Sequence, residues 1–149
     1  MKFLTLAICI ILTIHLEAQD TIYVSYNNLS KPSLEYKNRI ALAIMTLESM
    51  KGKYLYNPDD TLSSGWYGMR HIYILEVNHI LGFNRFTDAD RFDFVQSTLL
   101  FFYYNDYYIP DWDYRKIALL HCAGFAGLRN PSINTLNYWD KIKQILNTK

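Results

Sequence analysis

The chain has 149 residues, with 15 Lys and Arg against 14 Asp and Glu, and a formal net charge of +1. This length predicts a single domain, and a chain that is 50% hydrophobic and 19% charged is not a disordered one. So small a charge creates no field that favours nucleic acid. Two cysteines exclude a disulfide scaffold, and four histidines without His-Glu-x-x-His spacing argue against zinc. We expect neither a metal nor a cofactor.

Residues 1–18 have the pattern of a secretory signal peptide. Met1 and Lys2 precede an apolar stretch over residues 3–16, and Ala18 is a small residue ahead of a polar segment. The stretch is shorter than the ~20 residues that a membrane-spanning helix needs. We expect cleavage after Ala18, export to the periplasm or the exterior, and no integral membrane span in the mature chain. An uncleaved anchor is the alternative.

The rest of the chain is predicted to form an N-terminal arm over residues 19–32 and a mainly α domain over residues 33–149. Helical spacing of apolar residues, together with capping and breaking residues, defines five helices. They are residues 33–50, residues 69–81, a helix that follows residues 87–90 and ends before Pro110, residues 113–122, and residues 134–146. The segment 52–68 is rich in turn-forming residues and is predicted as a long loop with a small irregular or β element.

Local signals set the ends and the faces of these helices. Ser30 or Ser33 is a candidate N-cap, Gly82 and Gly124 are candidate C-terminal ends, and residues 87–90 resemble a capping box with Asp in place of Glu. The helix after the box is apolar on nearly every side, which predicts that it is central and buried. The last helix has an apolar stripe made of Tyr138, Trp139, Ile142, Ile145 and Leu146.

Glu48 is the sharpest candidate for chemistry. On a helical wheel it lies about 40° from Ile44 and about 80° from Ile40, at the margin of the apolar face. It is also near the C-terminal end of its helix, beside the long loop. Partial desolvation and the negative end of the helix dipole both favour the protonated carboxyl that a general acid requires. A solvated surface glutamate is the alternative interpretation.

Four short motifs follow one another along the chain. They are Glu48-Ser49, Gly68-Met69-Arg70-His71-Ile72, His121-Cys122-Ala123-Gly124, and Tyr138-Trp139. In this order they resemble the lysozyme-like lytic transglycosylases, which cleave peptidoglycan and carry Glu-Ser, Gly-Leu-Met-Gln-Ile, Ala-Tyr-Asn-Ala-Gly and a late Tyr. Residues 76–93, 107–110 and 134–139 resemble a bacterial and phage branch of the family. The resemblance covers roughly residues 38–146 and implies a lysozyme-like helical domain.

The resemblance implies a role for each matching residue. Glu48 matches the catalytic acid, Gly68 the glycine that lets the backbone approach the sugar, and Tyr138 the tyrosine that orients the glutamate. Ser49, Met69 and Gly124 match neighbouring positions of the substrate site. Two residues depart from the pattern: His71 stands where the family has Gln, and Cys122 where it usually has Asn. His71 can replace one hydrogen bond of Gln, whereas a thiol is a weak donor and acceptor.

The resemblance also implies a reaction and a partner. Glu48 would cleave the β-1,4 bond between N-acetylmuramic acid and N-acetylglucosamine of peptidoglycan glycan strands, and a 1,6-anhydro ring would close without a second carboxylate. A lysozyme-type hydrolase is an alternative, in which Asp59 or Asp60 positions a water. The alternative from another class is a non-catalytic protein that binds glycan or a partner protein. The sequence identifies no protein partner.

The remaining candidates have a structural and a functional interpretation. His121 either lines the cleft or is a core histidine, and Trp66 is the better candidate for sugar stacking. For Cys122, a buried small side chain is favoured over a nucleophile. Packing is likewise favoured over sugar stacking for the tyrosines at positions 103, 104, 107 and 108.

Overall fold

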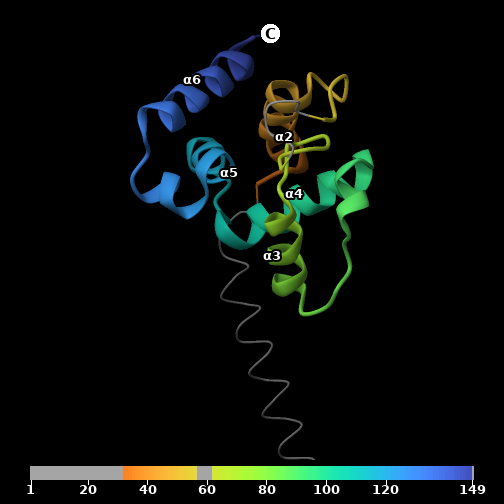
Figure 1. The fold of residues 1–149 in the computed structure, drawn as a ribbon. Helices are drawn as coiled ribbons and strands as arrows, with labels where there is room; N and C mark the ends of the chain where they lie inside the picture. Colours follow the sequence, from red (N-terminus) through yellow and green to blue (C-terminus); the bar gives the residue numbers. More distant parts are fainter. Residues whose placement is uncertain (1–31, 57–61, 149) are drawn as a thin grey trace, which may run out of the picture. The chain divides into compact units, whose positions relative to one another are not determined.

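The structure, a computed structural model, describes residues 32–56 and 62–148. The expected signal peptide, the arm up to residue 31, and both Asp59 and Asp60 lie outside these residues. The described helices, labelled as in Figure 1, are α2 (Leu34–Ser49), α3 (His71–Leu81), the 3₁₀ helix η1 (Asp88–Arg91), α4 (Phe94–Tyr108), α5 (Tyr114–Arg129) and α6 (Ile133–Asn147). The predicted mainly α class is confirmed. Within the described ranges, no helix is both long and apolar enough to cross a membrane.

Short polar side chains begin most of these helices. Ser33 accepts a hydrogen bond from the backbone of Tyr36 at the start of α2, and Ser132 does the same for Thr135 at the start of α6. The predicted capping box is present, but it begins the short η1 rather than the long helix. Asp93 caps α4 separately through the backbone N–H of Gln96, so the chain turns between the box and α4.

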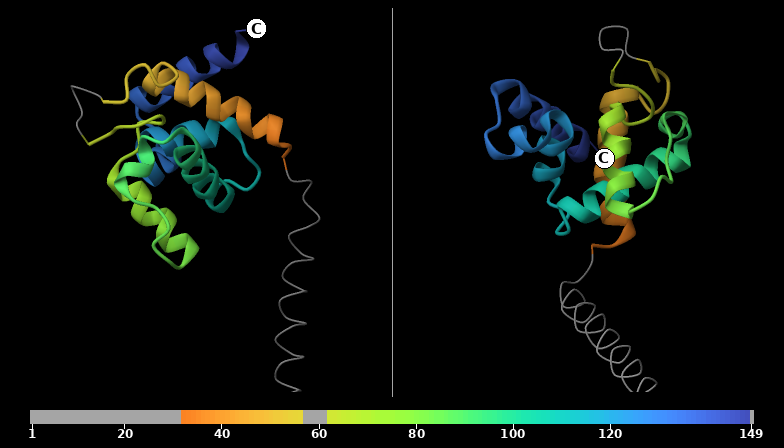
Figure 2. Two further views of the ribbon diagram at one scale, coloured as in Figure 1. Left: turned by 90° about the vertical axis from the view of Figure 1, so that its right-hand side faces the viewer. Right: turned by 60° about the horizontal axis from the view of Figure 1, so that its bottom comes forward.

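The helices form two groups that meet where α6 packs against α2. α6 packs against both α5 and α2, while α3 and η1 pack against α4. Figures 1 and 2 show α5 and α6 on one side and α2 and α3 on the other, while α4 crosses α3 and runs away from α5 toward η1. The largest fully buried side chains include Trp112, Phe101, Ile40, Ile44, Met69, Ile74, Leu100, Ile117 and Ile142.

The prediction of an all-round buried α4 is correct for its middle and wrong for its first turn. Leu100 and Phe101 are fully buried, whereas Phe94 is 48% and Val95 59% exposed. Phe94 makes an edge contact with Trp66, so it covers the loop rather than the core. A sequence pattern shows which positions of a helix are apolar but not which of them its neighbours cover. Here α3 and η1 cover only part of α4.

α5 extends beyond the predicted end at Gly124. Ala123 and Gly124 have non-helical backbone angles, Gly124 with φ 60° and ψ −157°, and the chain then resumes helical structure as far as Arg129. Only glycine adopts such angles readily, so Gly124 makes a kink instead of a terminus. The kink places residues 121–125 along the edge of the cavity described below.

The loop after α2 carries the predicted small β element in its simplest form. Ser64 makes isolated antiparallel bridges with Tyr56 and with Met69. Gly65 has φ 82°, and a Cβ there would overlap the carbonyl of Arg91. The loop is therefore held against the end of η1 at Gly65 and returns to α2 at Gly68.

Candidate active site

A cavity of about 600 Å³ opens between the two groups of helices. Its described lining comes from the end of α2, the loop, α3, α4, the kink of α5, and α6. Six of the predicted site residues meet there, although they are far apart in the sequence: Glu48, Gly68, Met69, His121, Gly124 and Tyr138. The cavity is thus the place where the sequence motifs converge.

The Glu48 carboxylate is held from two sides. The Tyr138 hydroxyl donates a hydrogen bond of 2.6 Å to Oε1, across 90 positions of sequence. On the other side, a Cβ built on Gly68 would lie 2.5 Å from Oε2, and the backbone there has φ 58°. A glycine at position 68 therefore lets the loop close against the carboxylate. Oε2 therefore lies beside the backbone of the loop, at a residue that lines the cavity.

Tyr138 is suited to remain a donor. Burial of its ring and the negative charge of Glu48 both raise the pKa of the Tyr138 hydroxyl well above its ordinary value near 10. The phenol is consequently protonated throughout the physiological range, and its proton points to Glu48. Tyr138 is a positioning residue for the carboxylate.

For the glycan cleavage that the family resemblance implies, we expect Tyr138→Phe to reduce turnover without unfolding the chain. The change removes one hydrogen bond to a charged group, worth about 1.5–3 kcal/mol, and leaves the ring that packs against the core. That energy corresponds to a fall of about 10- to 100-fold in the rate of glycan cleavage. Initial rates on purified peptidoglycan, beside thermal unfolding curves, measure both effects. Wild-type rates in this variant would contradict the positioning role.

Ser49 lies behind the cavity. It is fully buried, and its hydroxyl lies 3.1 Å from the carbonyl of Met45 and 2.9 Å from that of Trp66. It also accepts a hydrogen bond from the Gly52 backbone N–H. The side chain therefore joins the end of α2 to the loop. The cavity lining does not include Ser49 among its described residues.

Two further predicted binding residues also lie away from the described lining. His71 is exposed at the start of α3, and its Nδ1 is 2.7 Å from Asp88 Oδ2. On the helical wheel it is about 200° from Tyr73, which does line the cavity. Trp66 covers Gly52 and donates from Nε1 to the carbonyl of Phe92 at 2.9 Å. These contacts give His71 and Trp66 structural partners rather than a place at the cavity.

His121 combines the two interpretations that the sequence left open. It lines the cavity, and its Nε2 is 2.8 Å from the carbonyl of Tyr67. A carbonyl only accepts, so Nε2 carries the proton, and Nδ1 is a buried acceptor without a hydrogen-bond partner among the described residues. Burial lowers the pKa of His121, and the nearby Glu48 charge opposes that shift. The imidazole is therefore neutral near pH 7.

Because the pKa of His121 is lower in the folded chain than its usual value of about 6.5, its contribution to stability is complete above that pH. Below about pH 6.5 the unfolded chain binds the proton more readily, and stability falls. We expect the free energy of unfolding of the wild type to decrease faster than that of His121→Gln between about pH 6.5 and 5. Urea titrations at several pH values measure the difference. Parallel curves would contradict it.

Cys122 differs from the buried side chain that was predicted. It is an exposed free cysteine, and it lines the cavity next to His121. Partial burial of the sulfur and the charge of Glu48 raise the pKa of the thiol. The thiol is therefore protonated near neutral pH, and it offers only weak hydrogen bonding where the family usually has an amide. The exposure follows from the kink at Gly124, which a helical wheel does not represent.

The sequence analysis assigned no role to several residues of the cavity. Glu76 and Tyr73 line it from α3, and Phe125 lines it from α5. Glu76 follows Tyr73 by three residues, so both lie on the same face of α3. This spacing is the sequence signal that could have placed the two side chains together. Tyr104 is buried, as the packing interpretation predicted, and it also borders the cavity.

Metal-ligating side chains are dispersed in the described part of the chain. No three of its His, Cys, Asp or Glu side chains are grouped so that they could hold a metal ion.

Comparisons of the sequence with protein-family models and with curated proteins, and of the structure with solved structures, find no match.

Proposed function

We propose that the chain is an exported lytic transglycosylase that cleaves the bond between N-acetylmuramic acid and N-acetylglucosamine in peptidoglycan. One observation carries the proposal: Glu48 borders a cavity, with one carboxylate oxygen bonded to the Tyr138 hydroxyl and the other against Gly68. A half-buried carboxyl that is oriented by a hydroxyl donor at the wall of a cavity is an arrangement that a general acid and base can use. The order of the four motifs along the chain, which resembles that of the lytic transglycosylases, also supports the proposal.

The reaction needs Glu48 in two protonation states. The protonated carboxyl gives its proton to the bridging oxygen as the bond from C1 of the muramyl residue breaks, and positive charge develops on that sugar. The resulting carboxylate takes the proton from the 6-hydroxyl of the same sugar. The oxygen of that 6-hydroxyl then bonds to C1 and closes a 1,6-anhydro ring. The leaving sugar keeps the proton from the first transfer on its 4-hydroxyl. Tyr138 holds Oε1 during both transfers.

A glycan-binding protein without catalysis is the second candidate. Two observations favour it: Cys122 occupies the cavity wall where the family usually has Asn, and His71, in place of Gln, pairs with Asp88 outside the described lining. Both changes remove amide contacts to saccharide from the pattern that the family implies. Binding would then persist while the chemistry is lost.

Incubation of the chain with insoluble purified peptidoglycan distinguishes these candidates. We expect the protein to sediment with the polymer and to release soluble muropeptides into the supernatant. Sedimentation without release would support the non-catalytic alternative. Release of fragments with reducing ends would indicate a hydrolase instead. Neither sedimentation nor release, from a chain shown to be folded by circular dichroism, would contradict both proposals.

A further inference from the structure

A second carboxylate, Glu76, borders the same cavity from α3. The side chain is half-buried, and its Oε1 accepts a hydrogen bond from the Tyr108 hydroxyl of α4. Among the described residues, no Lys, Arg or His forms an ion pair with Glu76. Within the part of the chain that the structure describes, the carboxylate is therefore oriented by a neutral donor and not by an ion pair. The reaction proposed above does not use it.

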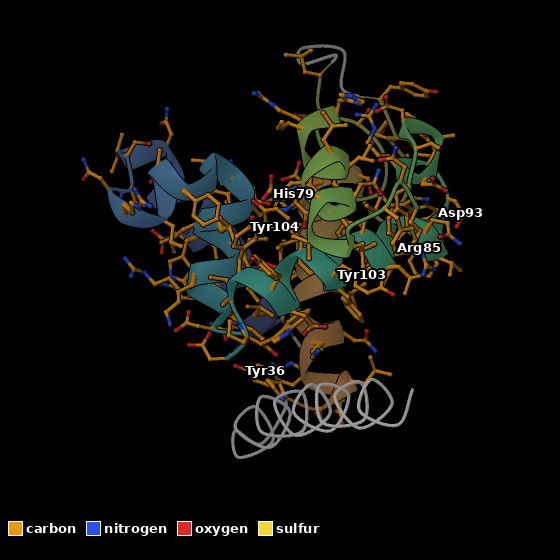
Figure 3. All side chains as sticks on the ribbon, turned by 90° about the horizontal axis from the view of Figure 1, so that it is seen from below. Tyr36, His79, Arg85, Asp93, Tyr103 and Tyr104 are labelled. Atoms are coloured by element: carbon orange, nitrogen blue, oxygen red, sulfur yellow. The ribbon has the colours of Figure 1, made fainter. Side chains whose placement is uncertain are left out.

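Aromatic rings surround this carboxylate. Tyr73 and Tyr104 stack with centroids 4.1 Å apart, and Tyr108 makes edge contacts of 4.8 Å with both Tyr104 and Phe125. Burial and the charge of Glu76 raise the pKa of Tyr104 to about 12, as expected if the ring is close to the carboxylate. Figure 3 shows Tyr104 between α3 and α5, whereas Tyr103 lies on the side of Arg85.

Carboxylates and aromatic faces together select a cation. The negative faces of tyrosine and phenylalanine rings attract ammonium groups, and an adjacent carboxylate supplies the counter-charge. The rest of the described lining adds to this field, because Glu48 is a second acid, Arg70 is the only Lys or Arg, and His121 is neutral near pH 7. An anionic group would be repelled at this end, and a neutral hydroxyl would leave the charge of Glu76 uncompensated.

We propose that the end of the cavity formed by Glu76, Tyr73, Tyr104 and Phe125 binds a primary ammonium group carried by the glycan strand. This inference rests on the proposed function, since it takes peptidoglycan as the carrier. Two parts of that polymer can present the group: the side-chain amine of the diamino acid in a peptide stem, and an amino sugar that lacks its acetyl group. The shared chemistry is a cation at a fixed distance from the cleaved bond.

Binding to a cleavage-deficient chain tests the inference. In the Glu48→Gln background, calorimetric titrations compare a peptidoglycan tetrasaccharide with tetrapeptide stems and free amines, the same compound after N-acetylation, and stem-free tetrasaccharides with and without one unacetylated glucosamine. We expect the amine-bearing form of at least one pair to bind about tenfold more tightly than its acetylated counterpart, a difference of about 1.4 kcal/mol. A preference within the first pair identifies the stem amine, and one within the second pair identifies the amino sugar.

Variants of the carboxylate complete the test. Glu76→Gln, added to that background, is expected to abolish the preference, Glu76→Asp to retain part of it, and Glu35→Gln, at an exposed glutamate of α2, to leave it unchanged. Equal binding of the amine-bearing and acetylated probes, or a preference that survives in folded Glu76→Gln, would overturn the inference. Selective binding by a chain whose wild type cleaves nothing would keep the inference and refute the proposed function. Cleavage by the wild type without selective binding of the amine would keep the proposed function and refute the inference.

Discussion

Replacing Glu48 by Gln is expected to reduce the rate of peptidoglycan cleavage by about 10²- to 10⁴-fold, the range that general acid–base groups contribute. The amide has nearly the same shape, and its oxygen can still accept the hydrogen bond from Tyr138. It has no acidic proton to give to the glycosidic oxygen and no charge with which to take one from the sugar. The rate of soluble muropeptide release measures the loss.

A matched control separates this effect from a general change in charge. Glu35→Gln removes the same charge from the exposed first turn of α2, far along the helix from position 48. It is expected to cleave at the wild-type rate. Circular dichroism and thermal unfolding of both variants check that the fold is intact. A Glu48→Gln protein that cleaves as fast as the Glu35→Gln control would remove Glu48 from the chemistry.

Gly68→Ala is expected to cost both stability and activity. Position 68 has φ 58°, where a side chain costs roughly 1–2 kcal/mol, and the new Cβ would lie 2.5 Å from Glu48 Oε2. Either the loop or the carboxylate has to move. A displacement of about 1 Å at a reacting group can lower the rate on the order of 100-fold. Cleavage rates and the free energy of unfolding, measured on one preparation, quantify both losses.

Gly82 provides the control for backbone strain alone. It ends α3 with φ 76°, and a Cβ there would meet nothing within 4 Å. Gly82→Ala should therefore lose only the roughly 1–2 kcal/mol of stability that the backbone strain costs, and keep its cleavage rate. If Gly68→Ala and Gly82→Ala cleave equally well, the close approach of the loop to Glu48 has no catalytic consequence.

Much of the fold could be predicted because its signals are local. Ser33 caps α2, Gly82 ends α3, and the Ile109-Pro110 step lies directly after α4. The errors arise where neighbours decide the outcome. The exposure of Phe94 and Val95 depends on how far α3 and η1 cover α4, and the continuation of α5 beyond Gly124 depends on a backbone angle that a sequence pattern does not report.

The candidate site could likewise be predicted where its signals are local, and not where neighbouring elements decide the position of a side chain. Glu48 was located from the margin of its apolar face, and the order of motifs brought in Gly68 and Tyr138, which contact it in the structure. The orientation of His71 could not be inferred, because its ion pair with Asp88 joins α3 to η1. Glu76 was missed for a related reason, since its environment is created by rings on α4 and α5.

The measurement that tests the central claim most directly is a mass spectrum of the fragments formed from purified peptidoglycan in ¹⁸O-labelled water. Wild-type and Glu48→Gln chains are compared under the same conditions. The proposed reaction predicts fragments that end in 1,6-anhydromuramic acid, contain no ¹⁸O, and are missing from the Glu48→Gln digest. Reducing ends that carry ¹⁸O, or no Glu48-dependent fragments from a folded chain, would contradict it.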